Sequence, residues 1–213
     1  MNILSIDTAK SSYSLSVLKN NKISTYCDKS DKTSSETILN EINNLVHKCN
    51  IVPGDINSVI YNNGPGSFTG VRVSSAIVQA IGFSNNCPVY GINSLMLDAF
   101  SYYKVNGINK IHVIRKAFGN QLFHGLLTLD SKKCLSNSAI VISVLEDIEF
   151  NPEYKLLTDL ENLGGDNNME FISIKDYIGS ELLIEFYKTY TKKKKKFDYK
   201  DALPSYAGLF YHI

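Results

Sequence analysis

The 213-residue sequence predicts an α/β protein, and three observations lead to that prediction. Short apolar runs of strand length alternate with longer segments whose apolar residues recur at helical spacing. The connections between these segments are short, as in α/β domains. The opening pattern, a strand that ends in a charged residue, begins again near residue 110. We therefore expect a duplicated α/β unit, with an N-terminal lobe over residues 1–100 and a smaller, divergent lobe over 101–213.

The composition fits an ordinary globular protein, with 44% hydrophobic and 20% charged residues. The formal net charge of +1 gives no global field toward nucleic acid or membrane, so an RNA role would need a local patch or a partner. We see no secretion signal, and the apolar runs are too short to span a bilayer, so we expect a cytoplasmic protein that does not bind membranes. The four cysteines stand singly and the four histidines form no HxxxH pair, so we expect no metal site.

The chain is expected to open with a buried strand over 2–7 and a hairpin. Residues 12–19 alternate, with Tyr13, Leu15 and Val17 on one face. Asn20 and Asn21 suit a tight turn because asparagine tolerates left-handed backbone geometry. Residues 22–28 form the returning strand.

A helix over residues 34–49 follows, introduced by a capping box of Thr33 and Glu36. Its apolar residues form one helical stripe. The stripe consists of Ile38, Leu39, Ile42, Leu45, Val46 and Cys49. The VPGD sequence ends this helix, and residues 57–63 form the next strand.

A second helix, over residues 67–84, starts directly after a glycine-rich turn, with Ser67 near its N-cap. Apolar residues surround this helix almost completely, and only Arg72, Ser75 and Gln79 form a narrow polar stripe. A helix of this kind should be covered on two sides. One cover is its own sheet, and the other is a neighbouring helix or a partner protein.

The remaining segments are expected to repeat the strand and helix pattern. Residues 88–92 form a strand and 94–105 a helix, followed by strands over 110–115, 120–130, 138–143 and 154–159 and a helix over 176–190. The lysine run 192–196 is interpreted as a solvated loop. The alternative is a phosphate-contacting tail for tRNA or nucleotide.

Three segments identify a resemblance to a known family. "ILSIDTAKSSYSLSVL", "NNGPGSFTGVRVSSAIVQAIGF" and "CPVYGINSL" resemble the TsaB (YeaZ) family in both motif and spacing. The GPGSFTG-x-R core is the most specific of these motifs. The resemblance covers residues 1–100, is weak over 101–195, and returns faintly at "DALPSYAG".

The resemblance implies two ribonuclease-H-like lobes of the actin-like ATPase superfamily, and a role in making N6-threonylcarbamoyladenosine at position 37 of tRNA. It implies a noncatalytic scaffold that binds the catalytic paralogue TsaD, with the ATPase TsaE joining them and tRNA reached through the complex. When TsaD is absent the chain would form a homodimer. No cofactor of its own is expected, and ATP and metal would sit on the partner proteins.

The sequence departs from the family pattern at three places. Ser34-Ser35-Glu36 replaces a His-Ser-Glu found in many relatives, and Arg115-Lys116-Ala117 replaces Asp-Ala-Arg in the second lobe. Asp7-Thr8 lies where actin-like ATPases place a carboxylate near metal and phosphate, but Ala9 and Lys10 follow it here. We therefore expect no catalytic residues and interpret Asp7 as a cap of its own turn.

The glycine turn of Gly64, Gly66, Ser67 and Gly70 has three interpretations. It could cradle a phosphate at the start of the following helix. It could be a packing turn in which the glycines permit positive φ and close approach. It could also present a partner surface. The Lys-Ser/Thr pair of a P-loop is missing, so packing together with a partner surface is favoured.

The two helices over 34–49 and 67–84 are the expected partner interface. Arg72 suits a hydrogen bond or ion pair to the partner, although it could equally be an exposed or internally paired arginine. The predicted interface residues are Leu39, Ile42, Val46, Phe68, Val71, Arg72, Ser75, Ile77 and Val78. Two other functions stay open, a small actin-like ATPase or kinase that uses Asp7, and, more remotely, a peptidase.

Overall fold

The computed structural model describes residues 1–10, 12–28, 35–130, 134–136, 140–160, 171–173, 177–191 and 198–205. Thr33 of the predicted capping box and the lysine run 192–196 lie outside these residues. No helix within the described ranges is both long enough and apolar enough to cross a membrane. The chain divides into two compact units. The first is formed by Met1–Ser94 together with Ile178–Ser205, and the second contains Leu95–Tyr177.

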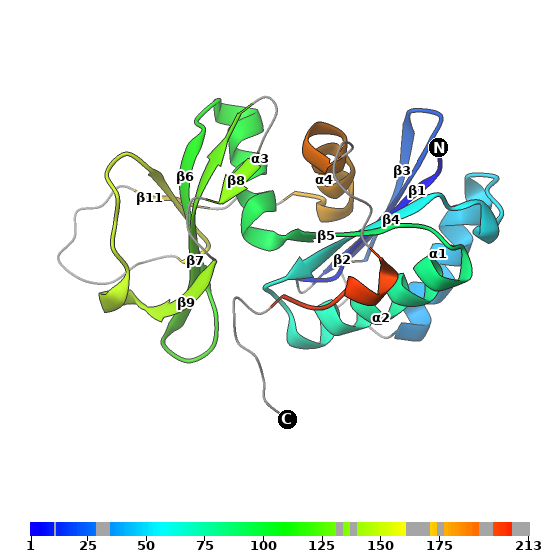
Figure 1. Cartoon of the computed structure of the whole chain (residues 1–213), viewed down its shortest axis with the longest axis horizontal. Coiled ribbons are helices and arrows are strands. Elements are labelled where there is room, and N and C mark those ends of the chain that lie inside the picture. The colour runs from blue at the N-terminus through cyan, green and yellow to red at the C-terminus, as the bar shows by residue number, and fades with distance from the viewer. Residues whose placement is uncertain are drawn as a thin grey trace. The chain divides into compact units, whose positions relative to one another are not determined.

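The first unit is built on a five-stranded sheet in the order β3-β2-β1-β4-β5 (Figure 1). The strands are β1 (Ile3–Asp7), β2 (Tyr13–Lys19), β3 (Lys22–Asp28), β4 (Ser58–Gly64) and β5 (Val89–Asn93). β2 runs antiparallel to β1 and β3, whereas β4 is parallel to both β1 and β5. The predicted hairpin is confirmed, and its turn residues Asn20 and Asn21 have φ values of 49° and 64°.

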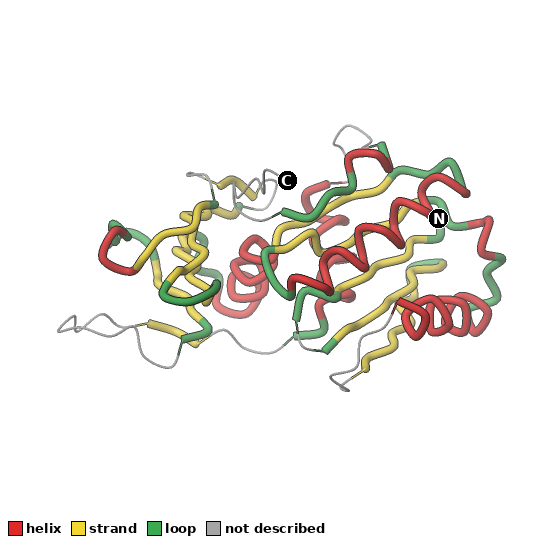
Figure 2. Tube along the Cα trace, turned by 90° about the horizontal axis from the view of Figure 1, so that it is seen from below, coloured by secondary structure: helices red, strands yellow, loops and turns green. Residues whose placement is uncertain are grey.

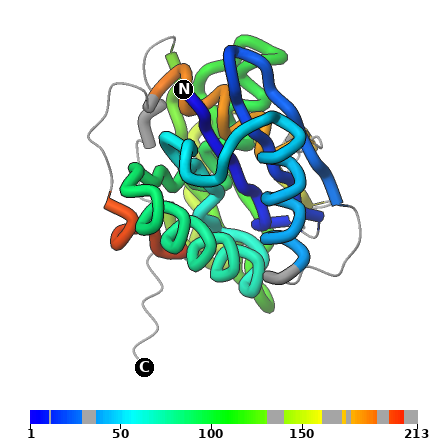
Figure 3. Tube along the Cα trace, turned by 90° about the vertical axis from the view of Figure 1, so that its right-hand side faces the viewer, coloured from blue at the N-terminus to red at the C-terminus, as the bar shows by residue number. Residues whose placement is uncertain are grey.

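Two helices, α1 (Ser35–Lys48) and α2 (Phe68–Ser84), cover one face of this sheet (Figures 2 and 3). Leu4 and Ile6 of β1 share one core cluster with Ile38 of α1 and with Ile77 and Val78 of α2. Alternate strand residues point to opposite faces, so the intervening Ser5 faces the other side. The apolar stripe predicted for residues 34–49 is therefore the side of α1 that faces the sheet, except for Leu39, which is 50% exposed.

The opposite face of the sheet is covered by α4 (Gly179–Phe186), which follows the second unit in the sequence. The Ser5 hydroxyl donates to the carbonyl of Ser180 at 2.8 Å, and Leu183 and Ile184 are fully buried. The predicted division placed residues 178–205 in the C-terminal lobe, and the structure places them in the first unit. The physical reason is the sheet itself, because without α4 one face of β1 and β2 would be left bare.

A second returning segment, residues 198–205, packs along the C-terminal half of α2, and we call it the C-terminal strap. It contains the 3₁₀ turn Tyr199–Asp201 and appears in red beside α2 in Figure 1. The Gln79 amide donates to the carbonyl of Ala202 at 3.0 Å, and the rings of Phe83 and Tyr199 meet with centroids 5.4 Å apart. The second cover expected for α2 is thus supplied in part by the chain itself.

The second unit contains α3 (Ser94–Asn106) and a six-stranded sheet in the order β11-β10-β6-β7-β8, with β9 also paired to β7. Its strands are β6 (Lys110–Lys116), β7 (Gln121–Leu129), β8 (Cys134–Ser136), β9 (Val141–Val144), β10 (Lys155–Thr158) and β11 (Phe171–Ser173). As in the first sheet, the leading strand β6 is central, with antiparallel strands on one side and parallel strands on the other. The two sheets thus share one strand order, as a duplicated unit would.

Candidate partner-binding face and glycine turn

The glycine turn joins β4 to α2 as predicted. Gly64 has a φ of 97°, a backbone conformation that favours glycine. Ser67 is the N-cap of α2, and its hydroxyl accepts the N–H of Gly70 at 3.2 Å. The predicted start of the helix is therefore confirmed.

The turn packs tightly against the loop that follows β1. A Cβ atom on Gly66 would lie 2.3 Å from the carbonyl oxygen of Ala9, and one on Gly70 would lie 1.9 Å from that of Thr8. The N–H of Ser67 donates to Ala9 at 2.7 Å, and the Thr8 hydroxyl donates to the carbonyl of Gly70 at 2.7 Å. These contacts favour the packing interpretation, because the chain's own carbonyl takes up a helix-start N–H that a phosphate would use.

Asp7, the residue considered for catalysis, is 3% exposed. One carboxylate oxygen, Oδ1, accepts the N–H of Ala9 at 3.0 Å, and this bond caps the turn after β1. The other, Oδ2, lies so close to Gly179 that a Cβ atom there would be 1.6 Å away. The carboxylate is therefore enclosed between its own turn and the start of α4.

The structure places six of the nine predicted interface residues in the core of the first unit. Each of these six is at most 6% exposed, so none contributes appreciably to the surface of this fold. They are Ile42, Val46, Val71, Ser75, Ile77 and Val78. The other three are on the surface, with Leu39 50% exposed, Phe68 55% exposed and Arg72 also exposed.

Five of the exposed residues of α2 form a stripe along the helix, which we call the α2 face. It consists of Phe68, Arg72, Ala76, Ala80 and Phe83, spaced three or four residues apart. The guanidinium of Arg72 lies 3.3 Å from the centroid of the Phe68 ring, a cation–π contact. The sequence-based prediction missed the two alanines and Phe83, because a helix apolar on all sides does not reveal which side meets its sheet.

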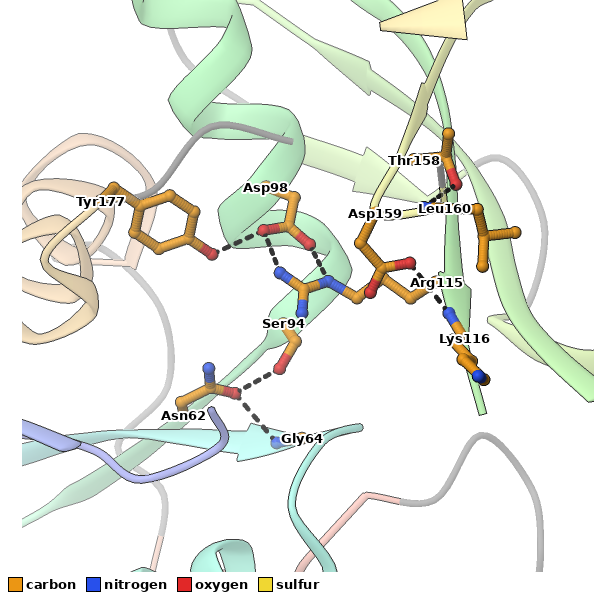
Figure 4. Close-up of polar contacts among 10 residues, drawn as sticks. All are labelled: Asn62, Gly64, Ser94, Asp98, Arg115, Lys116, Thr158, Asp159, Leu160 and Tyr177. Atoms are coloured by element: carbon orange, nitrogen blue, oxygen red, sulfur yellow. Dashed lines mark hydrogen bonds and ion pairs between the residues drawn. The ribbon is translucent and has the colours of Figure 1, made fainter. Parts of the chain in front are cut away.

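A polar network in the first unit links the end of β4 to the start of α3. The side-chain oxygen of Asn62 accepts the N–H of Gly64 at 3.0 Å and the hydroxyl of Ser94 at 2.8 Å (Figure 4). Asn62 is 1% exposed. Its bond to Gly64 holds the glycine turn in place from the strand side.

In the second unit, Arg115 forms a buried ion pair with Asp98 of α3. Its Nη2 donates to Asp98 Oδ1 at 2.6 Å and its Nε to Oδ2, and the Tyr177 hydroxyl donates to Oδ1 at 2.7 Å (Figure 4). Burial disfavours the charged guanidinium, but the Asp98 carboxylate outweighs this effect and raises the pKa of Arg115. The arginine that replaces an aspartate of many relatives therefore serves an internal ion pair.

No group of three His, Cys, Asp or Glu side chains that could hold a metal ion occurs among the residues that the structure describes. His112 and His124 lie together in the second unit, and within the described ranges no carboxylate or thiol joins them in a ligand set. The expectation that this chain holds no metal stays a prediction.

Comparison with solved structures shows which known fold the chain shares. The solved structure of YeaZ from Pseudomonas aeruginosa superimposes with a TM-score of 0.78 at 16% sequence identity, covering 96% of this chain and 99% of that one. The chain therefore shares the fold of that protein, and the predicted α/β fold class is confirmed.

A family model described as "TsaD: tRNA N6-adenosine threonylcarbamoyltransferase" matches residues 26–113. The tRNA threonylcarbamoyladenosine biosynthesis protein TsaB of Escherichia coli K12 is 29% identical over 52% of this chain and 48% of that protein. TsaB of Buchnera aphidicola from Schizaphis graminum is 31% identical, over 58% and 59%. The chain thus spans about half the length of the curated relatives it matches. These matches confirm the resemblance to the TsaB (YeaZ) family that is seen in the motifs of the chain.

Proposed function

We propose that this chain is a noncatalytic scaffold in the synthesis of N6-threonylcarbamoyladenosine at position 37 of tRNA. In this proposal it works in the cytoplasm and binds the catalytic paralogue TsaD through the α2 face. The observation that carries the proposal is the face itself, on which two phenylalanines and two alanines are exposed beside a single charged residue, Arg72. Exposed apolar patches of this kind mark interaction sites.

The α2 face suits a helix of a partner protein. Ala76 and Ala80 carry only a methyl group, so a second helix can approach the backbone of α2 closely. Phe68 and Phe83 stand near the two ends of the helix as large apolar anchors. Arg72 adds a charged group that can pair with an acidic residue of the partner.

The same face is compatible with the homodimer expected in the absence of TsaD. Phe68 precedes Ala76 by eight residues and Phe83 follows it by seven. Two antiparallel copies of α2 that cross at Ala76 would therefore pair each Phe68 with the Phe83 of the other copy. Arg72 would then face Ala80 rather than another arginine, so no like charges would meet.

The contacts of Asp7 and of the glycine turn, the two positions that resemble those of an actin-like ATPase, support the noncatalytic part of the proposal. Asp7 is enclosed by α4 and its own turn, and the glycine turn is packed against Ala9. In this proposal the chain carries no cofactor, ATP and metal belong to the partners TsaD and TsaE, and tRNA is reached through the complex. Metal-dependent ATP hydrolysis by the purified chain, lost in Asp7→Asn, would contradict this part.

The binding test changes Ala80 to glutamate and measures the Kd for TsaD. A charge in the centre of the α2 face should weaken binding at least tenfold, because it would be desolvated without a partner. Val105→Glu is the matched control, since Val105 is 73% exposed on α3 of the second unit. Val71 and Ile77 are unsuitable positions because they are buried. An unchanged Kd for a folded Ala80→Glu variant would refute the α2 face as the binding site.

A further inference from the structure

Three polar side chains lie in a row on one face of the second unit's sheet. His112 is on β6, His124 on β7 and Ser143 on β9. Nε2 of His112 is 3.4 Å from Nδ1 of His124, and Nε2 of His124 is 3.2 Å from the Ser143 hydroxyl. The row thus leads from the central strand to β9, which pairs with one end of β7.

The inner end of this row is buried and the outer end is not. His112 is 2% exposed, and the centroid of its ring is 5.8 Å from that of Phe150. His124 and Ser143 are half-buried. Burial, with a smaller contribution from His124, lowers the pKa of His112 to about 4, and burial lowers the pKa of His124. Both rings are therefore neutral at pH 7.

Charged groups nearby do not offset this effect. On β6, Lys110 pairs with Glu153. The segment that covers His112 carries three acidic residues, Glu146, Asp147 and Glu149, and all three are exposed. Burial and the neighbouring His124 lower the pKa of His112, and no carboxylate acts against them. A protonated His112 would therefore lie beside a second imidazole and apolar side chains, which do not stabilise its positive charge.

The cover over His112 is the segment 141–150, which comprises β9, the 3₁₀ turn Leu145–Asp147 and the residues up to Phe150. It is held by a small cluster in which Ile148 packs with Ile114, Leu122 and Leu156. The core of the first unit is much larger. Segments with few buried apolar contacts open at lower free energy than the rest of a protein.

Neutral rings permit one hydrogen bond between the histidines, in which one nitrogen donates and the other accepts. Protonation gives His124 an N–H at both nitrogens, so its Nδ1 can no longer accept. If both rings are protonated, two positive charges repel each other, and both His112 Nε2 and His124 Nδ1, which are 3.4 Å apart, carry a hydrogen that has no acceptor in the pair. Water can solvate these charges only when the cover is open.

We propose that the His112–His124 pair is an acid-sensitive latch for the segment 141–150. The segment stays packed on its sheet while both rings are neutral, and it opens locally when the pair takes up protons. The rest of the chain stays folded during this opening.

The direction of the effect follows from linkage. In the open segment His112 has the ordinary histidine pKa of 6.5, and in the closed segment its pKa is about 4. Between these values the open form binds more protons, so lowering the pH favours opening. Taken at these two pKa values, the opening equilibrium constant rises about 20-fold between pH 7 and pH 5.

The test is hydrogen exchange of the full chain at pH 7 and pH 5, corrected for the intrinsic pH dependence of exchange. The opening equilibrium constant of residues 141–150 should be about 20-fold larger at pH 5 than at pH 7. The amides of β1 and β4 should stay protected from exchange. Equal opening of 141–150 at both pH values, or a loss of protection throughout the chain, would overturn the latch.

Variants separate the latch from general acid sensitivity. His112→Phe removes the buried titrating group and keeps an aromatic ring beside Phe150, so its opening should not depend on pH. Where that variant fails to fold, His112→Leu gives the second readout, because it also removes the buried titrating group and places an apolar side chain beside Phe150, so its opening should not depend on pH either. His47→Gln, an exposed position on α1, should open like the unaltered chain. Acid opening that persists in a folded His112→Phe or His112→Leu variant would also overturn the proposal.

Discussion

At the scale of single residues, the glycine turn shows what close packing requires. Two backbones, the turn before α2 and the loop after β1, meet at Gly66 and Gly70 with no room for a side chain. Thr8 and Ala9 supply the carbonyl oxygens on the other side of this contact. Glycine is needed here for space, whereas Gly64 is needed for its positive φ.

Gly70→Ala should therefore destabilise the first unit by about 1–3 kcal/mol, because the added methyl group would overlap the carbonyl of Thr8. The change is measured by urea unfolding, from the shift in the midpoint urea concentration when the slope of free energy against urea concentration is the same for both proteins. Gly54→Ala is the matched control. A Cβ atom there has no neighbour within 4 Å, so the expected change is within about 0.5 kcal/mol. Equal midpoints for the two variants would contradict the packing interpretation.

At the scale of elements, α2 is held from three directions. Its inner side packs on β4, its first turn meets the loop after β1, and its C-terminal half carries the C-terminal strap. The strap is tied to β4 as well, through the Tyr61 hydroxyl to Leu203 at 3.1 Å and the N–H of Ser205 to Asn63 at 2.6 Å. The described residues that pack on α2 leave the α2 face open to a partner.

Two neighbouring strap residues offer a sharp test of this arrangement. Ala202 is 3% exposed and belongs to the core cluster, whereas Leu203 is 61% exposed. Ala202→Asp should cost at least about 2 kcal/mol of unfolding free energy, because it buries an unpaired carboxylate. Leu203→Asp should leave stability within about 0.5 kcal/mol. Urea unfolding measures both, and a strap that tolerates Asp at 202 would show that it does not contribute to the core.

The helix on the opposite face of this sheet, α4, depends on the sheet for the hydrogen bonds of its first turn. Its N-cap residue, Ile178, has no side chain that can accept a hydrogen bond. Instead the N–H of Ser180 donates to the hydroxyl of Ser14 at 3.0 Å, and the hydroxyls of Ser180 and Ser16 lie 2.7 Å apart. The first turn of α4 is thus satisfied by serines of β2, which sets where along the strand the helix docks.

At the scale of the whole molecule, the first unit is discontinuous in sequence. Residues 1–94 supply its sheet and two helices, and residues 178–205 supply α4 and the C-terminal strap. A chain that ends near residue 100 would expose the apolar face that Leu183 and Ile184 cover. Such a chain lacks part of its own core.

We therefore expect residues 1–100 alone to show no cooperative thermal unfolding transition. Residues 1–94 joined by a flexible linker to 178–205 should unfold cooperatively, because that protein has both layers of the unit. Circular dichroism during heating measures both. A cooperative transition in the shorter fragment would contradict the discontinuous unit and favour the division at residue 100.

Much of the fold could be predicted from local pattern. The spans of α1 and α2, the turn at Asn20 and Asn21, and the N-cap at Ser67 are each specified by neighbouring residues. The recurrence of the strand pattern near residue 110 was enough to predict the duplication. Local spacing determines these features because helix and strand periods and turn geometry depend on adjacent residues.

The candidate site was less predictable. The sequence indicated that α2 needs a second cover, but Val71 and Arg72 were assigned to the same interface, although one is fully buried and the other is exposed. Which side of a nearly all-apolar helix meets its sheet depends on contacts made far away in the chain. Phe83 and the two alanines became candidates only once those contacts were known.

By itself, the sequence determined the resemblance to the TsaB (YeaZ) family, the α/β class and the positions of the helices and strands in the N-terminal half. Only the tertiary structure decided that residues 178–205 return to the first unit, that Asp7 is enclosed by α4, and that the α2 face is the side left open. The physical reason is that burial is a property of the assembled layers. A residue's own neighbours set its local conformation, whereas segments more than 100 residues away decide whether it is covered.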